Sequence, residues 1–173
     1  MTLVHSDLQR FNPVTVIGAG TIGLSWATLF LAHGLTVRLF DPRTDLQEVV
    51  DQYFKSIGST LSLLGLPSSG LESRLTLESE LQQAVRSAAV IQENGPEKLE
   101  LKQQLFAEIE SYTEPYTLLL SSSSTIPASD ISASMKDKSR MLIGHPFNPP
   151  LVMPLVEVVP GTFTSAEAVE DAL

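Results

Sequence analysis

A glycine pattern near the amino terminus is the first candidate for a binding function. Residues 18–23 read G-x-G-x-x-G, and Asp41 follows 18 residues after Gly23. Glycines at this spacing allow a tight turn, a close approach of the backbone to a diphosphate, and close packing of a helix on a strand. Backbone N–H groups and the positive end of the helix dipole then bind phosphate without a lysine. A carboxylate at Asp41 can accept hydrogen bonds from both hydroxyls of an adenosine ribose.

The pattern therefore predicts a dinucleotide-binding turn. Glycines alone are weak evidence, but here an apolar run precedes them, a helical pattern follows, and the acid stands at the expected distance. Asp41 repels a 2′-phosphate and favours NAD over NADP, whereas Arg43 could favour NADP; FAD, which shares the fingerprint, is the main alternative. The residues expected to hold the cofactor here are Gly18, Gly20, Thr21, Ile22, Gly23 and Asp41.

A histidine and a glutamate mark a second candidate site. His145 stands in GHPFNPP (144–150), and Glu157 follows 12 residues later in LVEVV (155–159). With these two motifs and the glycine pattern, residues 14–161 resemble the NAD-binding domain of the 3-hydroxyacyl-CoA dehydrogenase superfamily. The GHPFNPP form and the V-P-G that follows resemble most the branch that contains lambda-crystallin (L-gulonate 3-dehydrogenase) and carnitine 3-dehydrogenase.

The resemblance implies an NAD-dependent oxidation of a secondary alcohol. His145 would remove the hydroxyl proton, since a neutral imidazole suits that work near neutral pH. Glu157 would bond the other ring nitrogen and fix the tautomer, as the aspartate does in a serine-protease triad. Ser124, 21 residues before the histidine, would bind the substrate oxygen. The resemblance adds three residues to the cofactor site: Glu97, Lys102 and Asn148.

Each catalytic candidate also has a structural interpretation. A single histidine after a strand is often structural, a glutamate among valines can be an edge-strand charge, and Ser124 can cap the helix that follows it. A second functional hypothesis is a non-catalytic NAD-binding or structural, crystallin-like protein. The substrate also stays open between a 3-hydroxyacyl-CoA and a small 3-hydroxy acid. The resemblance to the acyl-CoA enzymes implies the sequence S-N-T-S at this place, whereas this chain has four serines, Ser121–Ser124.

The family's C-terminal helical domain is expected to be absent, because its catalytic asparagine would fall beyond Leu173. The chain would then be part of a longer protein, half of an enzyme completed by a complementing helical domain, or a cofactor-binding remnant. Without that domain, apolar surface would be exposed, which predicts self-association, for example as a homo-oligomer.

Alternating apolar runs and helical patterns must position these residues, and they predict an α/β fold with a doubly wound, mostly parallel Rossmann sheet. We interpret 1–173 as one NAD-binding domain, with Trp26 in its core and His33 at a helix end. The expected strands are 13–17, 36–40, 75–77, 88–91, 116–120, 141–144 and 155–159. The expected helices are 22–31, 44–64, 79–87, 96–112, 129–135 and a last one from 164 onward.

Composition excludes several classes of function. A net charge of −9 disfavours binding to nucleic acid or to an anionic membrane. The chain has no cysteine, and His5, His33 and His145 are too scattered to predict a metal site. No run of roughly 18 apolar residues predicts a membrane span, and the amino terminus lacks the pattern of a signal peptide. We therefore expect a cytoplasmic protein that acts on a small molecule.

Overall fold

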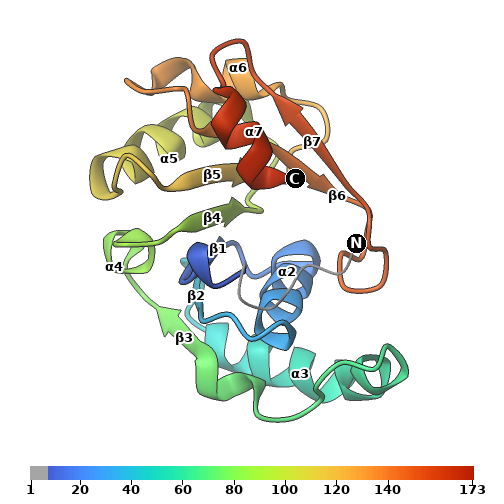
Figure 1. The fold of residues 1–173 in the computed structure, drawn as a ribbon. Coiled ribbons are helices and arrows are strands. Elements are labelled where there is room, and N and C mark those ends of the chain that lie inside the picture. Colours follow the sequence, from blue (N-terminus) through green and yellow to red (C-terminus); the bar gives the residue numbers. More distant parts are fainter. Residues whose placement is uncertain (1–7) are drawn as a thin grey trace.

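The fold is built on one seven-stranded sheet. The computed structural model describes residues 8–173, so that His5 lies outside the described residues (Figure 1). The strands lie in the order β3-β2-β1-β4-β5-β6-β7, and all neighbours are parallel except β6 and β7. Because the strand order reverses between β1 and β4, the predicted doubly wound Rossmann sheet is confirmed.

The elements follow one another as strand and helix along most of the chain. The strands are β1 (Val14–Ile17), β2 (Val37–Phe40), β3 (Leu75–Glu78), β4 (Val90–Glu93), β5 (Leu118–Ser121), β6 (Met141–Pro146) and β7 (Val156–Pro160). The α-helices are α2 (Thr21–Ala32), α3 (Leu46–Leu63), α4 (Leu81–Val85), α5 (Leu99–Tyr112), α6 (Ala128–Ile131) and α7 (Ala166–Ala172). Three short 3-10 helices are η1 (Gln9–Phe11), η2 (Leu71–Arg74) and η3 (Ser132–Ser134).

Several boundaries differ from the sequence prediction. Helix α5 begins at Leu99 and not at Pro96, and residues 94–98 form a loop. The helix expected over 129–135 divides into α6 and η3. Strand β7 runs antiparallel to β6, because the nine residues 147–155 between them are too few for a crossover connection.

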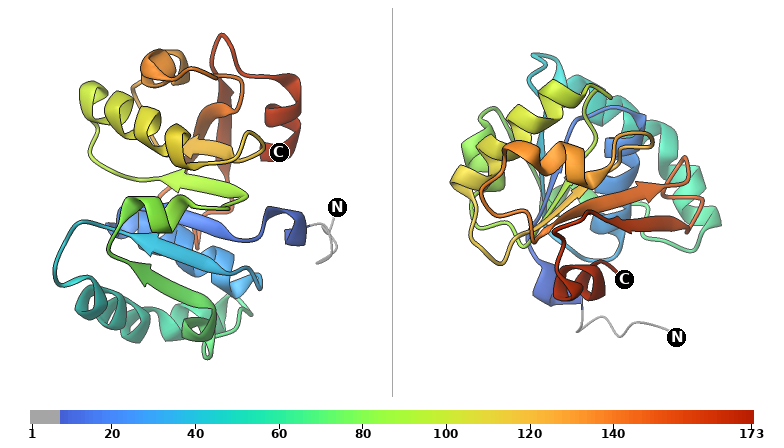
Figure 2. Two further views of the ribbon diagram at one scale, coloured as in Figure 1. Left: turned by 90° about the vertical axis from the view of Figure 1, so that its left-hand side faces the viewer. Right: turned by 90° about the horizontal axis from the view of Figure 1, so that it is seen from above.

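Two apolar layers enclose the sheet, and alternate residues of β1 face them in turn. Val14 and Val16 belong to the cluster that includes α2 and α3, whereas Ile17 belongs to the cluster with α5 and α6. Figure 2 shows helices packed on both sides of the sheet. Trp26, 7% exposed, lies in the first cluster, and His33 is the C-cap of α2, as predicted.

An open apolar groove remains on one face of β4–β7. It lies beside α2 and the end of α7 and has a volume of about 1040 Å³. Helix α7 and η1 lie side by side near it (Figure 2) and are joined by a salt bridge of 3.0 Å from Arg10 to Asp171. The lining is mostly apolar and includes Leu29, Phe30, Leu118, Leu120, Val156 and Val158. Self-association through this surface stays a prediction.

In the described part of the chain, no helix is both long and apolar enough to cross a membrane.

The packing of α2 on β1 gives a test of the fold. A Cβ added to Gly23 would lie 1.8 Å from the carbonyl oxygen of Gly18, so that Gly23→Ala forces the helix and the turn apart. We expect the free energy of unfolding to fall by about 1–3 kcal/mol, measured by urea denaturation. The control is Gly58→Ala inside α3, where a Cβ meets nothing within 4 Å. It should instead raise the value by about 0.5–1 kcal/mol. Equal effects of both substitutions would contradict the packing argument.

Candidate functional site

The glycine turn joins β1 to α2 at the point where the strand order reverses. The Gly18 N–H donates to the Phe40 carbonyl (2.8 Å), and Gly18 has a φ of +91°, which favours glycine. Gly20 is the N-cap of α2, and no side chain caps the helix. A Cβ at Gly20 would meet nothing within 4 Å, so the backbone is open there. Uncapped N–H groups beside open space, with Thr21 and Ile22 in the first turn, fit a diphosphate.

Asp41 lies against the same turn. Its Oδ2 accepts a hydrogen bond from the Ala19 N–H (2.7 Å), and its Oδ1 accepts one from the Arg43 N–H (3.1 Å). The Arg43 guanidinium binds Asp45 with two hydrogen bonds of 2.6 and 3.1 Å. These hydrogen bonds raise the pKa of the Arg43 guanidinium and lower the pKa of the Asp45 carboxyl. Since the Arg43 guanidinium is engaged with Asp45, the Asp41 carboxylate is the charge that lies against the turn, and a carboxylate there disfavours the 2′-phosphate of NADP.

His145 and Glu157 face one another across β6 and β7. They are directly opposed in the antiparallel register, and the His145 Nδ1 lies 2.8 Å from the Glu157 Oε2. In the described part of the chain, the other ring nitrogen makes no hydrogen bond, and the His145 side chain is 29% exposed. A carboxylate at Nδ1 stabilises the tautomer with the proton on Nδ1 and leaves Nε2 free to accept a proton.

Glu97 holds the serine loop that follows β5. Its Oε1 accepts hydrogen bonds from the Ser123 hydroxyl (2.6 Å), the Ser124 N–H (3.0 Å), and the N–H and hydroxyl of Thr125 (3.0 and 3.1 Å). Burial raises the pKa of the Glu97 carboxyl. The hydrogen bonds and the charge of Lys102 outweigh burial, so that the net pKa lies below its ordinary value. Glu97 is therefore an anion that fixes the backbone of Ser124.

Lys102 forms a buried ion pair that the sequence reasoning did not identify. Its Nζ lies 2.8 Å from each carboxylate oxygen of Glu93, and the two side chains are 2% and 0% exposed. Glu93 also accepts hydrogen bonds from the Gly95 N–H and the Ser121 hydroxyl, both at 2.6 Å. The Lys102 Nζ is 3.6 Å from the Glu97 Oε2. A glutamate two residues after the apolar run AAVI (88–91) is the signal that could have revealed it.

Apart from Lys102 in α5, the predicted residues lie near the carboxyl ends of β1, β2, β4, β5 and β6 and the start of the antiparallel β7, the side on which ligands bind in open α/β sheets. Ser124 is exposed and does not cap a helix, because α6 begins four residues later with Pro127 as its N-cap. Asn148 is exposed in the turn after β6, and no hydrogen bond in the described part joins its side chain to His145. Roles in cofactor binding for Glu97, Lys102 and Asn148 stay predictions.

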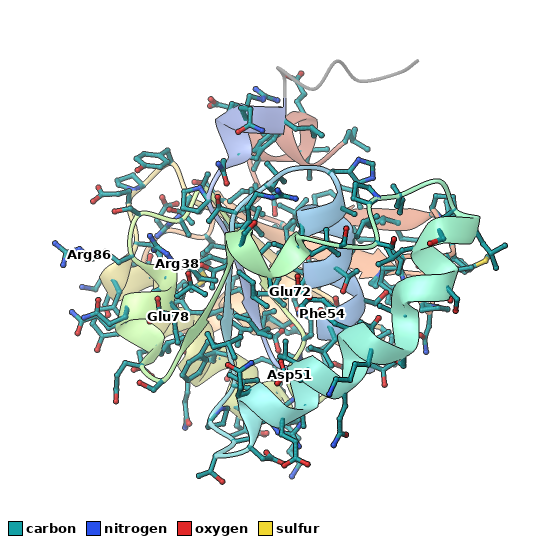
Figure 3. All side chains as sticks on the ribbon, turned by 90° about the horizontal axis from the view of Figure 1, so that it is seen from below. Arg38, Asp51, Phe54, Glu72, Glu78 and Arg86 are labelled. Carbon is teal, nitrogen blue, oxygen red and sulfur yellow. The ribbon has the colours of Figure 1, made fainter. Side chains whose placement is uncertain are left out.

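A second hollow lies elsewhere and lacks this chemistry. It has a volume of about 310 Å³ beside α4 and β3, and Figure 3 shows Arg38, Glu78 and Arg86 around it. The Arg38 guanidinium donates to the carbonyls of Gln83 and Arg86, so its charge is already engaged. Among residues 8–173, no cluster of histidine, aspartate and glutamate could hold a metal ion.

The buried pair predicts a strongly non-additive pattern of mutations. Lys102→Met leaves the Glu93 carboxylate buried without a counter-charge, and we expect a loss of about 3–5 kcal/mol of unfolding free energy. The double variant Glu93→Gln with Lys102→Met removes both charges and should lose clearly less than the sum of the two single variants. Urea denaturation of all four proteins measures the coupling. Additive losses would show that the pair contributes no interaction of its own.

Comparisons with known proteins agree with the geometry. Residues 13–173 match the family model of the 3-hydroxyacyl-CoA dehydrogenase NAD-binding domain. The chain is 42% identical over 161 residues to an L-carnitine dehydrogenase of Streptomyces coelicolor, covering 93% of this chain and 51% of the relative. It is 42% identical over 166 residues to a 3-hydroxyacyl-CoA dehydrogenase of Gibberella moniliformis, covering 95% and 51%.

A solved structure shows the same fold. The 3-hydroxybutyryl-CoA dehydrogenase of Escherichia coli K12 superposes with a TM-score of 0.86 at 34% identity, covering 94% of this chain and 35% of that one. The chain spans about half the length of the curated relatives it matches. With its Rossmann topology, open glycine turn and matched family model, the chain belongs to the 3-hydroxyacyl-CoA dehydrogenase family as an NAD-binding domain.

Proposed function

We propose that this chain is the cofactor domain of an NAD-dependent dehydrogenase that oxidises the 3-hydroxyl group of a 3-hydroxyacyl-CoA or a small 3-hydroxy acid, with His145 as the general base. The observation that carries the proposal is the 2.8 Å contact between His145 and Glu157, on the same side of the sheet as the glycine turn, where the parallel strands end. The names of the relatives, L-carnitine dehydrogenase and 3-hydroxyacyl-CoA dehydrogenase, support both substrate classes.

The glycine turn and Asp41 are the residues that would hold NAD, and bound NAD would supply the hydride acceptor. The free N–H groups at the start of α2 would hold the diphosphate, and Asp41 would accept hydrogen bonds from the adenosine ribose. The serine loop follows β5, and Glu97, which holds this loop, follows β4. Both strands lie between β1, which leads into the glycine turn, and β6, which carries His145. Asn148, in the turn after β6, orients the cofactor or the turn itself.

His145 removes the hydroxyl proton of the substrate at its free Nε2. Glu157 keeps the Nδ1 proton in place and stabilises the imidazolium that forms. Ser124 donates a hydrogen bond to the substrate oxygen, and the bond from its N–H to Glu97 (3.0 Å) keeps its backbone in position. His145 thus transfers the proton, Glu157 orients the base, and Ser124 positions the substrate oxygen.

Gly20→Ala tests cofactor binding apart from folding. The added methyl group meets no protein atom within 4 Å, and Gly20 has a φ of −77°, so the melting temperature should be unchanged. The same methyl group occupies the space where a diphosphate would approach the backbone, and we expect NAD binding to weaken by about tenfold or more. Calorimetric titration with NAD measures the dissociation constant. Gly58→Ala is the matched control, and unchanged NAD affinity in Gly20→Ala would refute the assignment of the turn.

His145→Gln tests the base. Turnover should fall by about 10²- to 10⁴-fold, whereas NAD affinity should stay unchanged, because the substitution removes only the proton acceptor. Glu157→Gln should also lower turnover, and Glu167→Gln, an exposed glutamate in α7, serves as the control. NADH formation is followed with L-carnitine and with L-3-hydroxybutyryl-CoA, in this chain alone and mixed with the second half of an L-carnitine dehydrogenase. NAD binding without turnover in either form would instead support a non-catalytic NAD-binding protein.

A further inference from the structure

The hydroxyl group of Ser122 is the centre of a hydrogen-bond network on the groove side of the sheet. It donates to the Asn94 Oδ1 (2.8 Å) and accepts from the Gln92 Nε2 (2.8 Å) and the Trp26 Nε1 (3.3 Å). A serine hydroxyl has one donor and two acceptor positions, so every position is used. The network therefore has a single arrangement of donors and acceptors.

Two amides extend this network in opposite directions. The Asn94 Nδ2 donates to the carbonyl of Ile17 (3.1 Å), the residue directly before the glycine turn. The Gln92 Nε2 also donates to the carbonyl of Gly144 (3.3 Å), the residue directly before His145. One continuous chain of hydrogen bonds thus joins the backbone that leads into the turn to the backbone that carries the histidine. It crosses the sheet from β1 through β4 and the end of β5 to β6.

Gln92 is buried where an apolar side chain would be expected, which indicates that the network has a role beyond core packing. Gln92 is 1% exposed and lies in β4 between the apolar residues of the groove lining. A buried amide costs free energy unless its hydrogen bonds are made, and an apolar side chain would avoid that cost. Both N–H bonds of the Gln92 amide are used here, and a polar network whose donors are all bonded in such a place fixes geometry more than it adds stability. The geometry fixed here is the spacing between the two halves of the site.

We propose that Ser122 is a positioning residue that sets the His145 strand relative to the glycine turn, and so places the imidazole against the nicotinamide. This inference rests on the proposed function. Reacting groups held by a supporting shell lose efficiency when they shift by about 1 Å, which is why such a link matters. Ser122 acts through Gln92 and Asn94, and the chain of hydrogen bonds needs no contact between Ser122 and substrate.

The experiment compares NAD and NADH complexes of the whole chain. NAD has a positive charge on the nicotinamide ring and NADH does not, so an imidazole placed against that ring has a different NMR signal in the two complexes. The chain is small enough for this at 18.8 kDa and has three histidines. His145→Gln assigns the signal. All spectra are recorded at one pH with saturating cofactor.

We expect a clear difference between the two complexes in the wild-type chain. In Ser122→Ala the difference should shrink by about half or more, because the link between the turn and β6 is cut. Ser122→Thr keeps the hydroxyl and should keep the difference. Gln92→Met cuts the link at another point, and should reduce the difference even if Ser122→Ala folds poorly. Ser132→Ala, a buried serine in η3 bonded to the Ser129 carbonyl, is the matched control.

The outcomes separate two kinds of failure. A wild-type difference that Ser122→Ala and Gln92→Met leave unchanged would overturn the positioning role while the proposed function stands. So would a lowered melting temperature in Ser122→Ala with the wild-type difference retained, since that result describes a structural role alone. A wild-type chain that binds both cofactors with the same His145 signal, or binds neither, overturns the proposed function and this inference together.

Discussion

The close contact between the start of α2 and the end of β1 is the constraint on which the site depends. Gly23 lies so near the Gly18 carbonyl that a methyl group there would overlap it at 1.8 Å. Gly18 in turn approaches the Asn94 carbonyl, which a Cβ would meet at 2.9 Å. Helix α2 therefore points its uncapped end at the switch point between β1 and β4. Every other residue of the site is placed relative to this end of the helix.

The sequence predicted the contacts that depend on local spacing. The glycine pattern, Asp41, and the 12-residue separation of His145 from Glu157 each describe a segment of chain short enough for the motif to specify its geometry. The Rossmann sheet followed from the alternation of apolar runs with helical patterns. Strand β7 was also expected, but its antiparallel direction depends on the short link before it.

The sequence did not predict contacts between elements that are distant along the chain. Lys102 was expected to meet the cofactor, and the structure turns its ammonium group to Glu93, which no motif had marked. Periodicity identifies the buried face of α5 but not which strand end a long side chain reaches. Gln92 and Glu93 show the result. As neighbours in a strand they point to opposite faces, so that one residue begins the neutral network and the other the charged one.

His145 and Glu157 are paired across a hairpin, and this pairing limits how the segment can change during evolution. Their contact is made by the ladder of β6 and β7, which the link extends by one hydrogen bond from the Phe147 N–H to the Leu155 carbonyl (3.0 Å). Side chains in the rest of the link, residues 148–154, can therefore change without altering this pair, provided that the two strands keep their alignment. A slip of the ladder by one residue would send the carboxylate to the opposite side of the sheet. The tip of the hairpin is thus free to diverge, while His145 and Glu157 stay opposed for as long as the ladder keeps its register.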